Sequence, residues 1–326
     1  MELTRSSARH FIPAKVHQDN AAPINSVDFH RTDNLLVTAG DDDTIHMYNT
    51  QTGLSLKTVQ SKKYGVRCII FSHHPSSVIY TSNKGSDHTI RYLSLHDNRF
   101  LRYFGGHTHR VTSLCISPRT DLFMSSSLDK TVRLWDLRSH VCQGILAVPS
   151  VPMAAFDQQG LIFGVGASTG VVKLFDARNF DKGPFSTFEV EQEGRTLSSF
   201  SCLKFSRDGK LILGVVEGRI SVLDSFTGKS VLRQPIRHSS GAVSLEASFS
   251  PDGQFIVSGH EDHSVRVYDA ATGEQVCSWL SHSKLPRSVK WSPNQMLVAS
   301  ACESLVLWIP DLQKALSAKS ELGANG

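Results

Sequence analysis

The chain of 326 residues lacks the segments that mark membrane-spanning and secreted proteins. No apolar run approaches the length of about 18 residues that a membrane-spanning helix needs. The first residues, MELTRSSARHFIP, contain no apolar stretch of the kind that a secretory signal requires. The six cysteines are scattered without a Cys-x-x-Cys pair, which argues against a disulfide framework and a zinc site. The sequence therefore predicts a soluble intracellular protein with no direct contact to a membrane.

A strong charge of either sign is also lacking. The chain has 34 basic and 30 acidic residues, a net charge of +4, whereas a sequence-specific nucleic-acid-binding domain is more basic and more clustered. No paired carboxylates, nucleophile–base pair or metal-ligand cluster stands out at a recognisable spacing. We therefore expect no catalytic residue, no cofactor, no metal and no direct sequence-specific nucleic-acid partner. The 40% of hydrophobic residues is enough to form a substantial core.

One short motif matches a sequence pattern found in hydrolase active sites. Residues 166–170 read Gly-Ala-Ser-Thr-Gly, which matches the nucleophile pattern of hydrolases. That pattern needs a strand, a sharp turn and then a helix. Here an alternating segment, Val-Val-Lys-Leu-Phe-Asp at 171–176, follows instead, so we interpret the motif as a connection between two strands.

What the chain does contain is a repeated unit of four predicted strands. Each unit has two apolar strands, a tight polar turn, and then an alternating strand that ends in an aromatic residue or Leu, such as TVRLWD at 131–136. The residues that end this third strand are 40 to 48 positions apart: Tyr48, Leu93, Trp135, Phe175, Leu223, Tyr268 and Trp308. This period is typical of WD40 blades. We predict an all-β, seven-bladed WD40 β-propeller.

The third unit carries the polar residues that lock a blade in WD40 proteins. His107, Asp129, a strand serine and Trp135 are expected to form a buried hydrogen-bonded chain, because a buried imidazole and a buried indole N–H both need partners. We expect Ser127, or a serine beside it, to supply the hydroxyl. The turn aspartates of other units are assigned the same blade-locking role: Asp42, Asp87 and Asp262.

The ring needs one more strand than the seven units supply. The seventh unit ends at Trp308-Ile309-Pro310 with no fourth strand after it. We predict that the segment Phe11 to His17 is the missing outer strand, which would remove an exposed sheet edge. The predicted organisation is a propeller over 11–313, an N-terminal extension over 1–10 and a disordered tail over 314–326.

Basic side chains gather in the loops expected on one face of the disc. They precede blades two and three or lie in the tight turn of blade two: Lys62, Lys63, Tyr64, Lys84, His109 and Arg110. A basic patch with a tyrosine can bind a phosphorylated or acidic peptide through charge-assisted hydrogen bonds. The alternative is an ordinary solvated face.

Several segments go beyond a generic WD40 repeat. They are SKKYGV (61–66), DHTIRYLSLHDNRFLRYFGGH (87–107), LDKTVRLWDLRS (128–139), FDKGPF (180–185), KFSRDGKLIL (204–213) and VSLEASFSPDGQFIV (243–257). The chain resembles the WD40-repeat subunit of COMPASS-type histone H3 lysine-four methyltransferase complexes, the Swd-two-like family. This resemblance implies a nuclear, non-catalytic scaffold with SET-domain methyltransferase subunits as partners. It also implies association with the phosphorylated RNA polymerase II tail, and with protein phosphatase one complexes in transcription termination and mRNA 3′-end processing.

A second hypothesis is a substrate receptor of a cullin-RING ubiquitin ligase. Residues 135–138, Trp-Asp-Leu-Arg, match the WDxR box of such receptors, and residues 175–178, Phe-Asp-Ala-Arg, are a near match. The residues that would contact the ligase adaptor are Trp135, Asp136, Arg138, Asp176 and Arg178. An arginine two positions after the aspartate is common in WD40 strands, so the motif leaves both hypotheses open.

Overall fold

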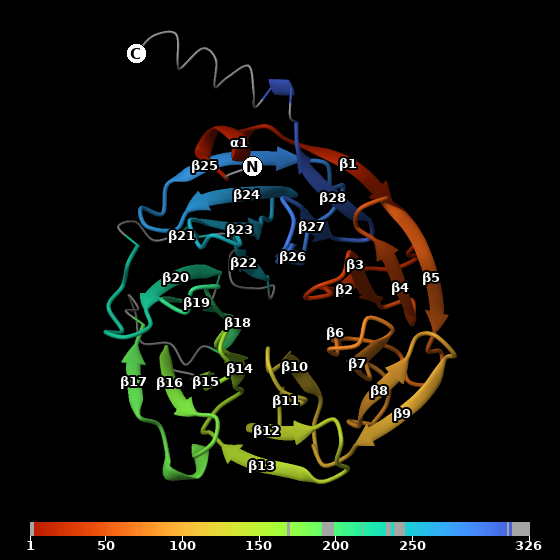
Figure 1. The fold of residues 1–326 in the computed structure, drawn as a ribbon, viewed down its shortest axis with the longest axis vertical. Helices are drawn as coiled ribbons and strands as arrows, with labels where there is room; N and C mark the ends of the chain where they lie inside the picture. Colours follow the sequence, from red (N-terminus) through yellow and green to blue (C-terminus); the bar gives the residue numbers. More distant parts are fainter. Residues whose placement is uncertain are drawn as a thin grey trace.

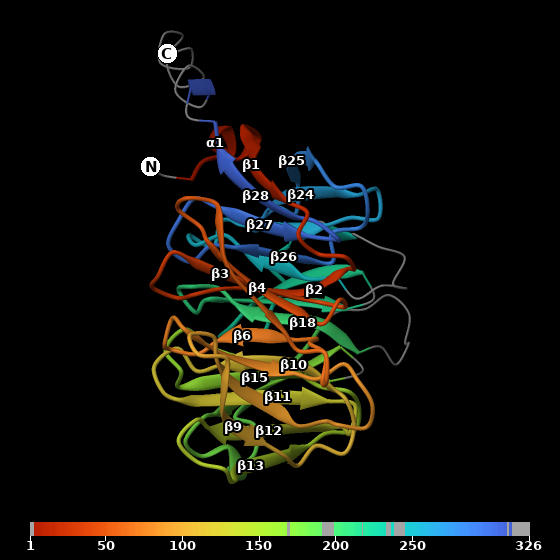
Figure 2. The ribbon, with the colours of Figure 1, turned by 90° about the vertical axis from the view of Figure 1, so that its right-hand side faces the viewer.

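Antiparallel four-stranded sheets follow one another around a central axis (Figure 1). The computed structural model describes residues 3–167, 170–190, 199–216, 218–232, 236–237, 245–311 and 313–314. Within these ranges the strands form seven sheets, which confirms the predicted seven-bladed propeller. The side view shows a disc with loops on two opposite faces (Figure 2).

Each blade contributes one strand to each of four concentric layers. The innermost strands are β2 (Ile24–Phe29), β6 (Ile69–Phe71), β10 (Val111–Ile116), β14 (Met153–Phe156), β18 (Phe200–Phe205), β22 (Ala247–Phe249) and β26 (Ser288–Trp291). The second strands are β3 (Leu35–Gly40), β7 (Ser77–Thr81), β11 (Leu122–Ser127), β15 (Ile162–Ala167), β19 (Leu211–Val216), β23 (Phe255–Gly259) and β27 (Val298–Ala301). The third strands are β4 (Thr44–Asn49), β8 (Ile90–Ser94), β12 (Thr131–Asp136), β16 (Val171–Asp176), β20 (Arg219–Asp224), β24 (Ser264–Asp269) and β28 (Leu305–Pro310). The outer strands are β5 (Leu54–Gln60), β9 (Arg99–Phe104), β13 (Cys142–Ala147), β17 (Ser186–Glu189), β21 (Ile236–Arg237), β25 (Gln275–Leu280) and, in the last blade, β1 (Phe11–His17).

The strand order defines two faces of the disc. The upper face carries the connections between blades and the turns between second and third strands. The lower face carries the turns between first and second strands and between third and outer strands. Loops on a rigid scaffold are where binding residues usually lie, so the two faces are the surfaces to compare.

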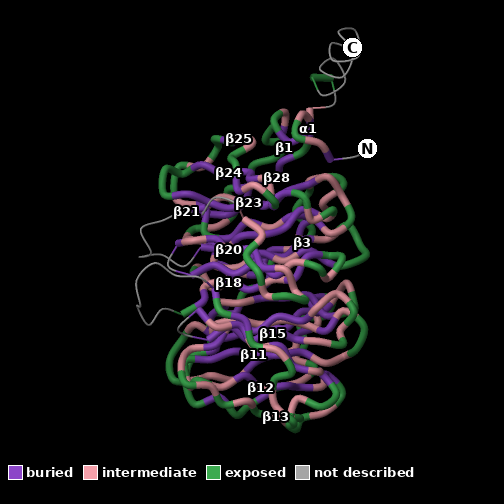
Figure 3. Tube along the Cα trace, turned by 90° about the vertical axis from the view of Figure 1, so that its left-hand side faces the viewer, coloured by how far each residue is buried: buried purple, intermediate pink, exposed green. Residues whose placement is uncertain are grey.

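Packing between blades explains the repeated aromatic or Leu at the end of the third strand. Tyr48 belongs to a core cluster shared with blade seven, and Trp135 to one shared with blade two. Tyr48 lies opposite Leu36, and Trp135 lies opposite Phe123, in the registers of their blades. All four side chains are fully buried. The second and third strands carry most of the buried residues, while most residues of the outer strands are exposed or half-buried (Figure 3).

The first strand in the chain closes the last blade, as predicted. β1 pairs with β28 from Phe11 opposite Pro310 to His17 opposite Leu305. Phe11 is buried and stacks on Trp279 of blade six, with ring centroids 4.9 Å apart. The two ends of the propeller are therefore joined both by a β ladder and by an aromatic contact to the neighbouring blade.

A short helix precedes the closing strand, where the sequence predicts only an extension. α1 (Arg5–Arg9) begins at Thr4, whose side chain accepts a hydrogen bond from the backbone N–H of Ser7. The indole N–H of Trp279 donates to the carbonyl of Ala8 at 3.2 Å. Residues 3–10 thus pack on blade six. Most of the predicted disordered tail, residues 315–326, lies outside the described residues.

Candidate partner-binding surfaces

A buried chain of hydrogen bonds locks blade three. His107 Nδ1 lies 2.7 Å from Asp129 Oδ2, and His107 Nε2 lies 2.7 Å from Ser125 Oγ. The indole N–H of Trp135 donates to the same hydroxyl at 2.8 Å. Burial lowers the pKa of His107. Burial alone would raise the pKa of Asp129, but hydrogen bonds from Thr131 and His107 outweigh it and lower that pKa to about 2. A neutral imidazole therefore lies between a carboxylate and a hydroxyl.

The hydroxyl of this lock belongs to Ser125, two residues before Ser127. The expectation that Ser127 supplies it is therefore wrong, whereas the alternative, a nearby serine, agrees with the structure. Ser127 Oγ instead donates to the carbonyl of His109 at 2.9 Å and accepts the backbone N–H of Asp129 at 3.1 Å. Both serines point to the same side of β11. Ser127 is two residues, or about 7 Å, farther along the strand towards the upper face, beyond the reach of Trp135.

The turn aspartates of blades one, two and six hold their turns without forming this chain. Asp42, Asp87 and Asp262 each accept the backbone N–H two residues later, at 3.0 to 3.1 Å. Their other partners differ: Asn20 beside Asp42, Arg91 beside Asp87, and Arg266 beside Asp262. These three aspartates therefore hold the turns of their blades without a His–Ser–Trp chain. In blade one an asparagine, Asn20, stands at the position that His107 has in blade three.

Blade seven has a lock that the sequence analysis missed. His282 Nε2 lies 2.6 Å from Ser300 Oγ, and the indole of Trp308 donates to the same oxygen at 2.7 Å. Cys302 Sγ, 3.2 Å from His282 Nδ1, takes the place of the aspartate. The separation of 18 residues between histidine and serine is the same as in blade three and could have revealed it. The closing blade therefore depends on a thiol where the family pattern has a carboxylate.

The basic residues predicted on the upper face are only partly free. The ammonium group of Lys84 pairs with Asp43 and donates to the carbonyl of Lys62 at 2.9 Å. The side chains of Lys62 and Lys63 are exposed and have no ion pair among the described residues. Lys84 thus supports the loop of Lys62, and its charge is already neutralised.

Tyr64 is fixed between two cations. The guanidinium carbon of Arg91 lies 3.5 Å from the centroid of the Tyr64 ring, and Lys63 Nζ lies 5.0 Å from it. Arg91 is almost fully buried and also pairs with Asp87. Contact with a cation stabilises an aromatic ring in place, so Tyr64 is held beside Lys63.

His109 and Arg110 extend the same face towards blade three. The rings of His109 and His88 are parallel, with centroids 6.4 Å apart, so the turn of blade two and the loop before blade three are in contact. Arg110 is exposed, and no ion pair to it occurs within the described ranges. The upper-face patch, defined here as Lys62, Lys63, Tyr64 and Arg110, therefore offers one fixed ring and three cations that have no ion pair among the described residues, from the loops before blades two and three.

The residues of the possible ligase-adaptor motif divide into buried and exposed ones. Trp135 is fully buried in the blade lock, so it cannot be a contact residue. The side chain of Arg138 is 76% exposed and bonds to Asp136 at 2.8 Å. Arg178 is also exposed, and its backbone N–H donates to Asp176 at 2.8 Å. The two arginines lie on the lower rim of adjacent blades.

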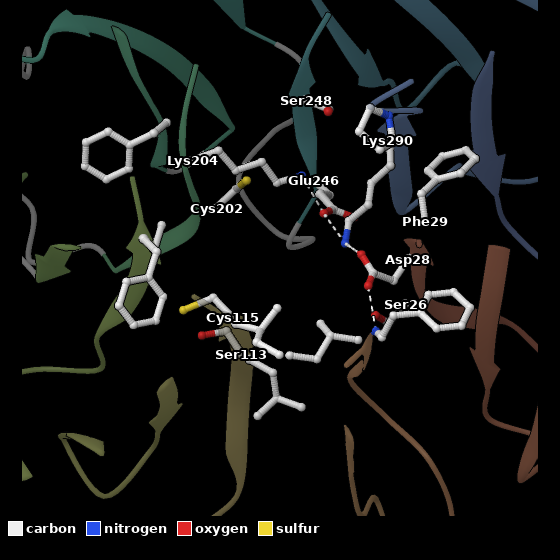
Figure 4. Close-up of a pocket in the computed structure, with 18 of the residues that line it drawn as sticks. Ser26, Asp28, Phe29, Ser113, Cys115, Cys202, Lys204, Glu246, Ser248 and Lys290 are labelled. Carbon is white, nitrogen blue, oxygen red and sulfur yellow. Dashed lines mark hydrogen bonds and ion pairs between the residues drawn. The ribbon is translucent and has the colours of Figure 1, made fainter. Parts of the chain in front are cut away.

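A channel of about 980 Å³ runs along the axis between the innermost strands (Figure 4). Lys290 Nζ lies 3.1 Å from Asp28 Oδ1 and 3.7 Å from Glu246 Oε1, and Lys204 Nζ lies 2.6 Å from Glu246 Oε1. Burial alone would raise the pKa of Glu246, but the two lysines outweigh it and lower that pKa. These four residues, here called the channel network, connect blades five, six, seven and one from the inside.

The repeat explains where the channel network comes from. The residue before the last aromatic or Ile of each first strand faces the channel: Asp28, Ile70, Cys115, Ala155, Lys204, Ser248 and Lys290. Alternation along a strand puts this position and the one two residues earlier on the same side. Aligning the seven units at this position would have shown that three of them carry a charge.

The hydrolase-like motif at residues 166–170 lies between two strands of blade four. Gly166 and Ala167 end β15, and Val171 begins β16, so the hydrolase-like motif joins two antiparallel strands. Its Ser168 and Thr169 lie outside the described residues.

Among the residues that the structure describes, no group of three or more His, Cys, Asp or Glu side chains is arranged to hold a metal. No helix in the described part of the chain has the length and apolar character needed to cross a membrane.

Comparisons with known proteins agree with the blade structure. The family model "WD domain, G-beta repeat" matches residues 12–49, 98–136 and 230–269. Each match begins at an outer strand and ends with the third strand of the next blade. The sequence repeat is therefore shifted by one strand from the structural blade, and this shift is what places the first strand of the chain in the last blade.

Full-length relatives are also found. The chain is 45% identical over 319 residues to WD repeat-containing protein 82 of Drosophila melanogaster, covering 97% of this chain and 99% of the relative. It is 37% identical to Set1 complex component swd2 of Schizosaccharomyces pombe, covering 77% and 72%. It is 29% identical to COMPASS component SWD2 of Saccharomyces cerevisiae, covering 93% and 95%.

Proposed function

The chain belongs to the family of WD-repeat proteins that contains WD repeat-containing protein 82 and Swd2, and we propose that it is a non-catalytic scaffold subunit of a histone H3 lysine-four methyltransferase complex. The observation that carries this proposal is similarity over most of the chain to proteins named as Set1 complex and COMPASS components. The proposed location is the nucleus, and the proposed partners are the SET-domain methyltransferase and its associated subunits.

The structure supports a scaffold role physically. Blade locks, the closing strand and the channel network hold the sheets in one arrangement, so both loop faces are presented with little loss of conformational entropy on binding. A rigid disc with two faces can hold two partners in a fixed relative position. A scaffold subunit acts in this way: it holds other proteins in place and does not make or break covalent bonds.

Affinity purification of the tagged full chain, followed by mass spectrometry, tests the proposal. We expect a SET-domain methyltransferase and its subunits among the recovered proteins. Depletion of the protein is expected to lower trimethylation of histone H3 lysine four. A purification without a methyltransferase, together with unchanged methylation after depletion, would show that the assignment is wrong.

We further propose that the upper-face patch binds the phosphorylated tail of RNA polymerase II. Lys62, Lys63 and Arg110 are exposed and have no ion pair within the described residues, and Tyr64 is held beside Lys63 by Arg91. Phosphate groups form strong charge-assisted hydrogen bonds with such cations. The family resemblance also supports association with a protein phosphatase one complex in transcription termination, for which we assign no surface.

Charge reversal tests the tail-binding surface. Lys63→Glu combined with Arg110→Glu is expected to weaken binding of a phosphorylated tail peptide by at least about tenfold and to reduce its dependence on salt. The control is Lys284→Met with Glu303→Gln, which removes a neutralised pair from the same face, away from the loop of Lys62, without changing the net charge. Titration calorimetry with the doubly reversed protein would refute the assignment if the affinity stayed unchanged.

A second candidate function rests on the two exposed arginines of the lower rim. Arg138 and Arg178 occupy equivalent positions in adjacent blades, at the ends of the WDxR match and of the near match. Replacing both with alanine is expected to abolish co-purification of a ligase adaptor. Recovery of the same amount of adaptor with the variant, or none with the unmodified protein, would exclude this function and leave the scaffold assignment unaffected.

A further inference from the structure

Three arginines surround the lower mouth of the axial channel. Arg31 follows β2, Arg119 follows β10, and Arg207 follows β18, each in the turn between the first and second strands of its blade. Arg31 and Arg207 line the channel, and Arg119 comes directly after Pro118, which also lines it. The turns that carry the three arginines therefore come from blades one, three and five, on different sides of a single opening.

None of the three guanidinium groups has an acidic partner among the described residues. Arg119 donates to the side-chain amide oxygen of Gln159, and Arg207 donates to the carbonyl of Pro293 at 2.8 Å. The side chain of Arg31 has no hydrogen bond in the described part of the structure. Desolvation by the surrounding chain, followed by the positive charges of Arg207 and Arg119, lowers the pKa of the exposed Arg31. Like charges thus converge at the mouth, which is unfavourable without an anion.

Nearby carboxylates do not neutralise this cluster. Asp157, which lines the same end of the channel, accepts the backbone N–H groups of Gln159, Leu161 and Ile162 at 2.9 to 3.0 Å and so holds its own turn. The other channel-lining carboxylates, Asp28 and Glu246, are paired with the lysines of the channel network. The turns of the three arginines also carry carboxylates, but Asp33 lies 3.4 Å from His30, Asp121 lies 3.9 Å from Arg138 and Asp208 lies 3.7 Å from Lys210. The three guanidinium groups at the mouth are therefore left without an ion pair among the described residues.

The fold itself does not require these arginines. The position after the small polar residue that ends the first strand is Pro118, Pro251 or Pro293 in blades three, six and seven. Blades one and five carry Arg31 and Arg207 at that same position. Proline suits the tight turn there, so arginine is not the residue that the turn alone would favour.

We propose that the lower mouth of the channel binds a compact, multiply phosphorylated small molecule, with one phosphate group at each of the three arginines. Guanidinium groups bind phosphate oxygens in a bidentate manner, which favours arginine over lysine for this task. A linear acidic peptide would fit cations arranged in a row, whereas these cations are arranged around an opening. This site is on the face opposite the upper-face patch and does not depend on the proposed scaffold function.

Titration calorimetry with inositol hexakisphosphate as the probe tests the proposal on the full chain at near-physiological ionic strength. We expect saturable binding of one molecule per chain. Each substitution among Arg31→Gln, Arg119→Gln and Arg207→Gln is expected to weaken it by about tenfold, because a hydrogen bond to a charged group is lost. The matched control is Arg138→Gln with Arg178→Gln, which removes two arginines from the rim of the same face. Thermal melting checks that each variant is folded.

Three results would overturn the proposal. The first is the lack of saturable binding by the unmodified protein. The second is an equal loss of affinity in the rim control, which would indicate unspecific attraction to the charge of the disc. The third is tighter binding of a phosphorylated peptide of equal charge that requires the same three arginines, which would replace the compact ligand with an extended one.

Discussion

Ser125 and Ser127 of β11 make different hydrogen bonds, although the side chains of these two residues point to the same side of the strand. Ser125→Ala would leave the indole N–H of Trp135 and the Nε2 atom of His107 without a partner in a buried site. We expect it to lower the free energy of unfolding by about 2–4 kcal/mol. Ser127→Ala, which affects two backbone partners nearer the upper face, is expected to cost about 1 kcal/mol. Urea denaturation measures both.

Equal effects of the two substitutions would show that the blade does not depend on the Ser125 lock. The sequence could predict the members His107, Asp129 and Trp135, because their residue types and spacing are diagnostic. It could not choose between Ser125 and Ser127, since both have the side-chain direction and chemistry that the lock needs. Only the strand register, in which Phe123 lies opposite Trp135, decides between them.

Cys302 makes the stability of blade seven depend on pH. Burial alone would raise the pKa of its thiol, but hydrogen bonds from His282 and Ser304 outweigh burial and lower it to about 6, from an ordinary value of 9.0. Between these two values the folded state holds a thiolate and the unfolded state a thiol. The contribution to stability therefore increases as the pH rises and is lost as the pH falls through 6. We expect the unmodified protein to gain about 2 kcal/mol over Cys302→Ser between pH 6 and pH 8, measured by urea denaturation.

Cys115 provides the control for this experiment. Burial raises the pKa of its thiol to about 12, so it is protonated in both states across the same pH range. Cys115→Ser is expected to change stability by the same amount at pH 6 and at pH 8. A difference between the unmodified protein and Cys302→Ser that does not vary with pH would mean that Cys302 is not a thiolate in the folded state.

At the scale of elements, the attachment of β1 to the propeller depends on the side of the strand that carries Phe11. Phe11 is 5% exposed and contacts Trp279 and Trp291, whereas its neighbour Ile12 is 41% exposed. We expect Phe11→Ala to lower the free energy of unfolding by about 3–4 kcal/mol, because it leaves a cavity between two blades. Ile12→Ala is expected to cost less than about 1 kcal/mol. Equilibrium denaturation measures the stability, and limited proteolysis near the N-terminus reports whether the strand has detached.

Similar losses from the two substitutions would contradict a closure held by the Phe11 side of the strand. The closing strand could be predicted because the repeat leaves one blade a strand short, and Phe11 to His17 was unassigned. The helix α1 could not, since five residues are too few to show a helical period. It is fixed by contacts with blade six, including the ion pair between Arg5 and Asp269 at 2.7 Å.

For the whole molecule, the repeat period determined the number of blades, but it did not reveal how the ring is held from the inside. Asp28, Lys204 and Lys290 are ordinary charged residues of alternating strands when each unit is viewed alone. They meet only because the ring brings the innermost strands of different blades to one axis. A property that arises from closure cannot be read from a single repeat.

Because the channel network links several blades, we expect a substitution within it to destabilise more than one blade. Glu246→Gln would leave Lys204 without its carboxylate and Lys290 with only Asp28, so we expect a loss of about 2 kcal/mol in the free energy of unfolding. Because Lys290 joins blade seven to blade one, hydrogen exchange should increase in β26 and β2 as well as in blade six. The control is Lys210→Met, which removes an exposed pair with Asp208 and should cost less than about 0.5 kcal/mol. An increase in exchange confined to blade six would show that the blades are stabilised one at a time and that the network does not couple them across the closure.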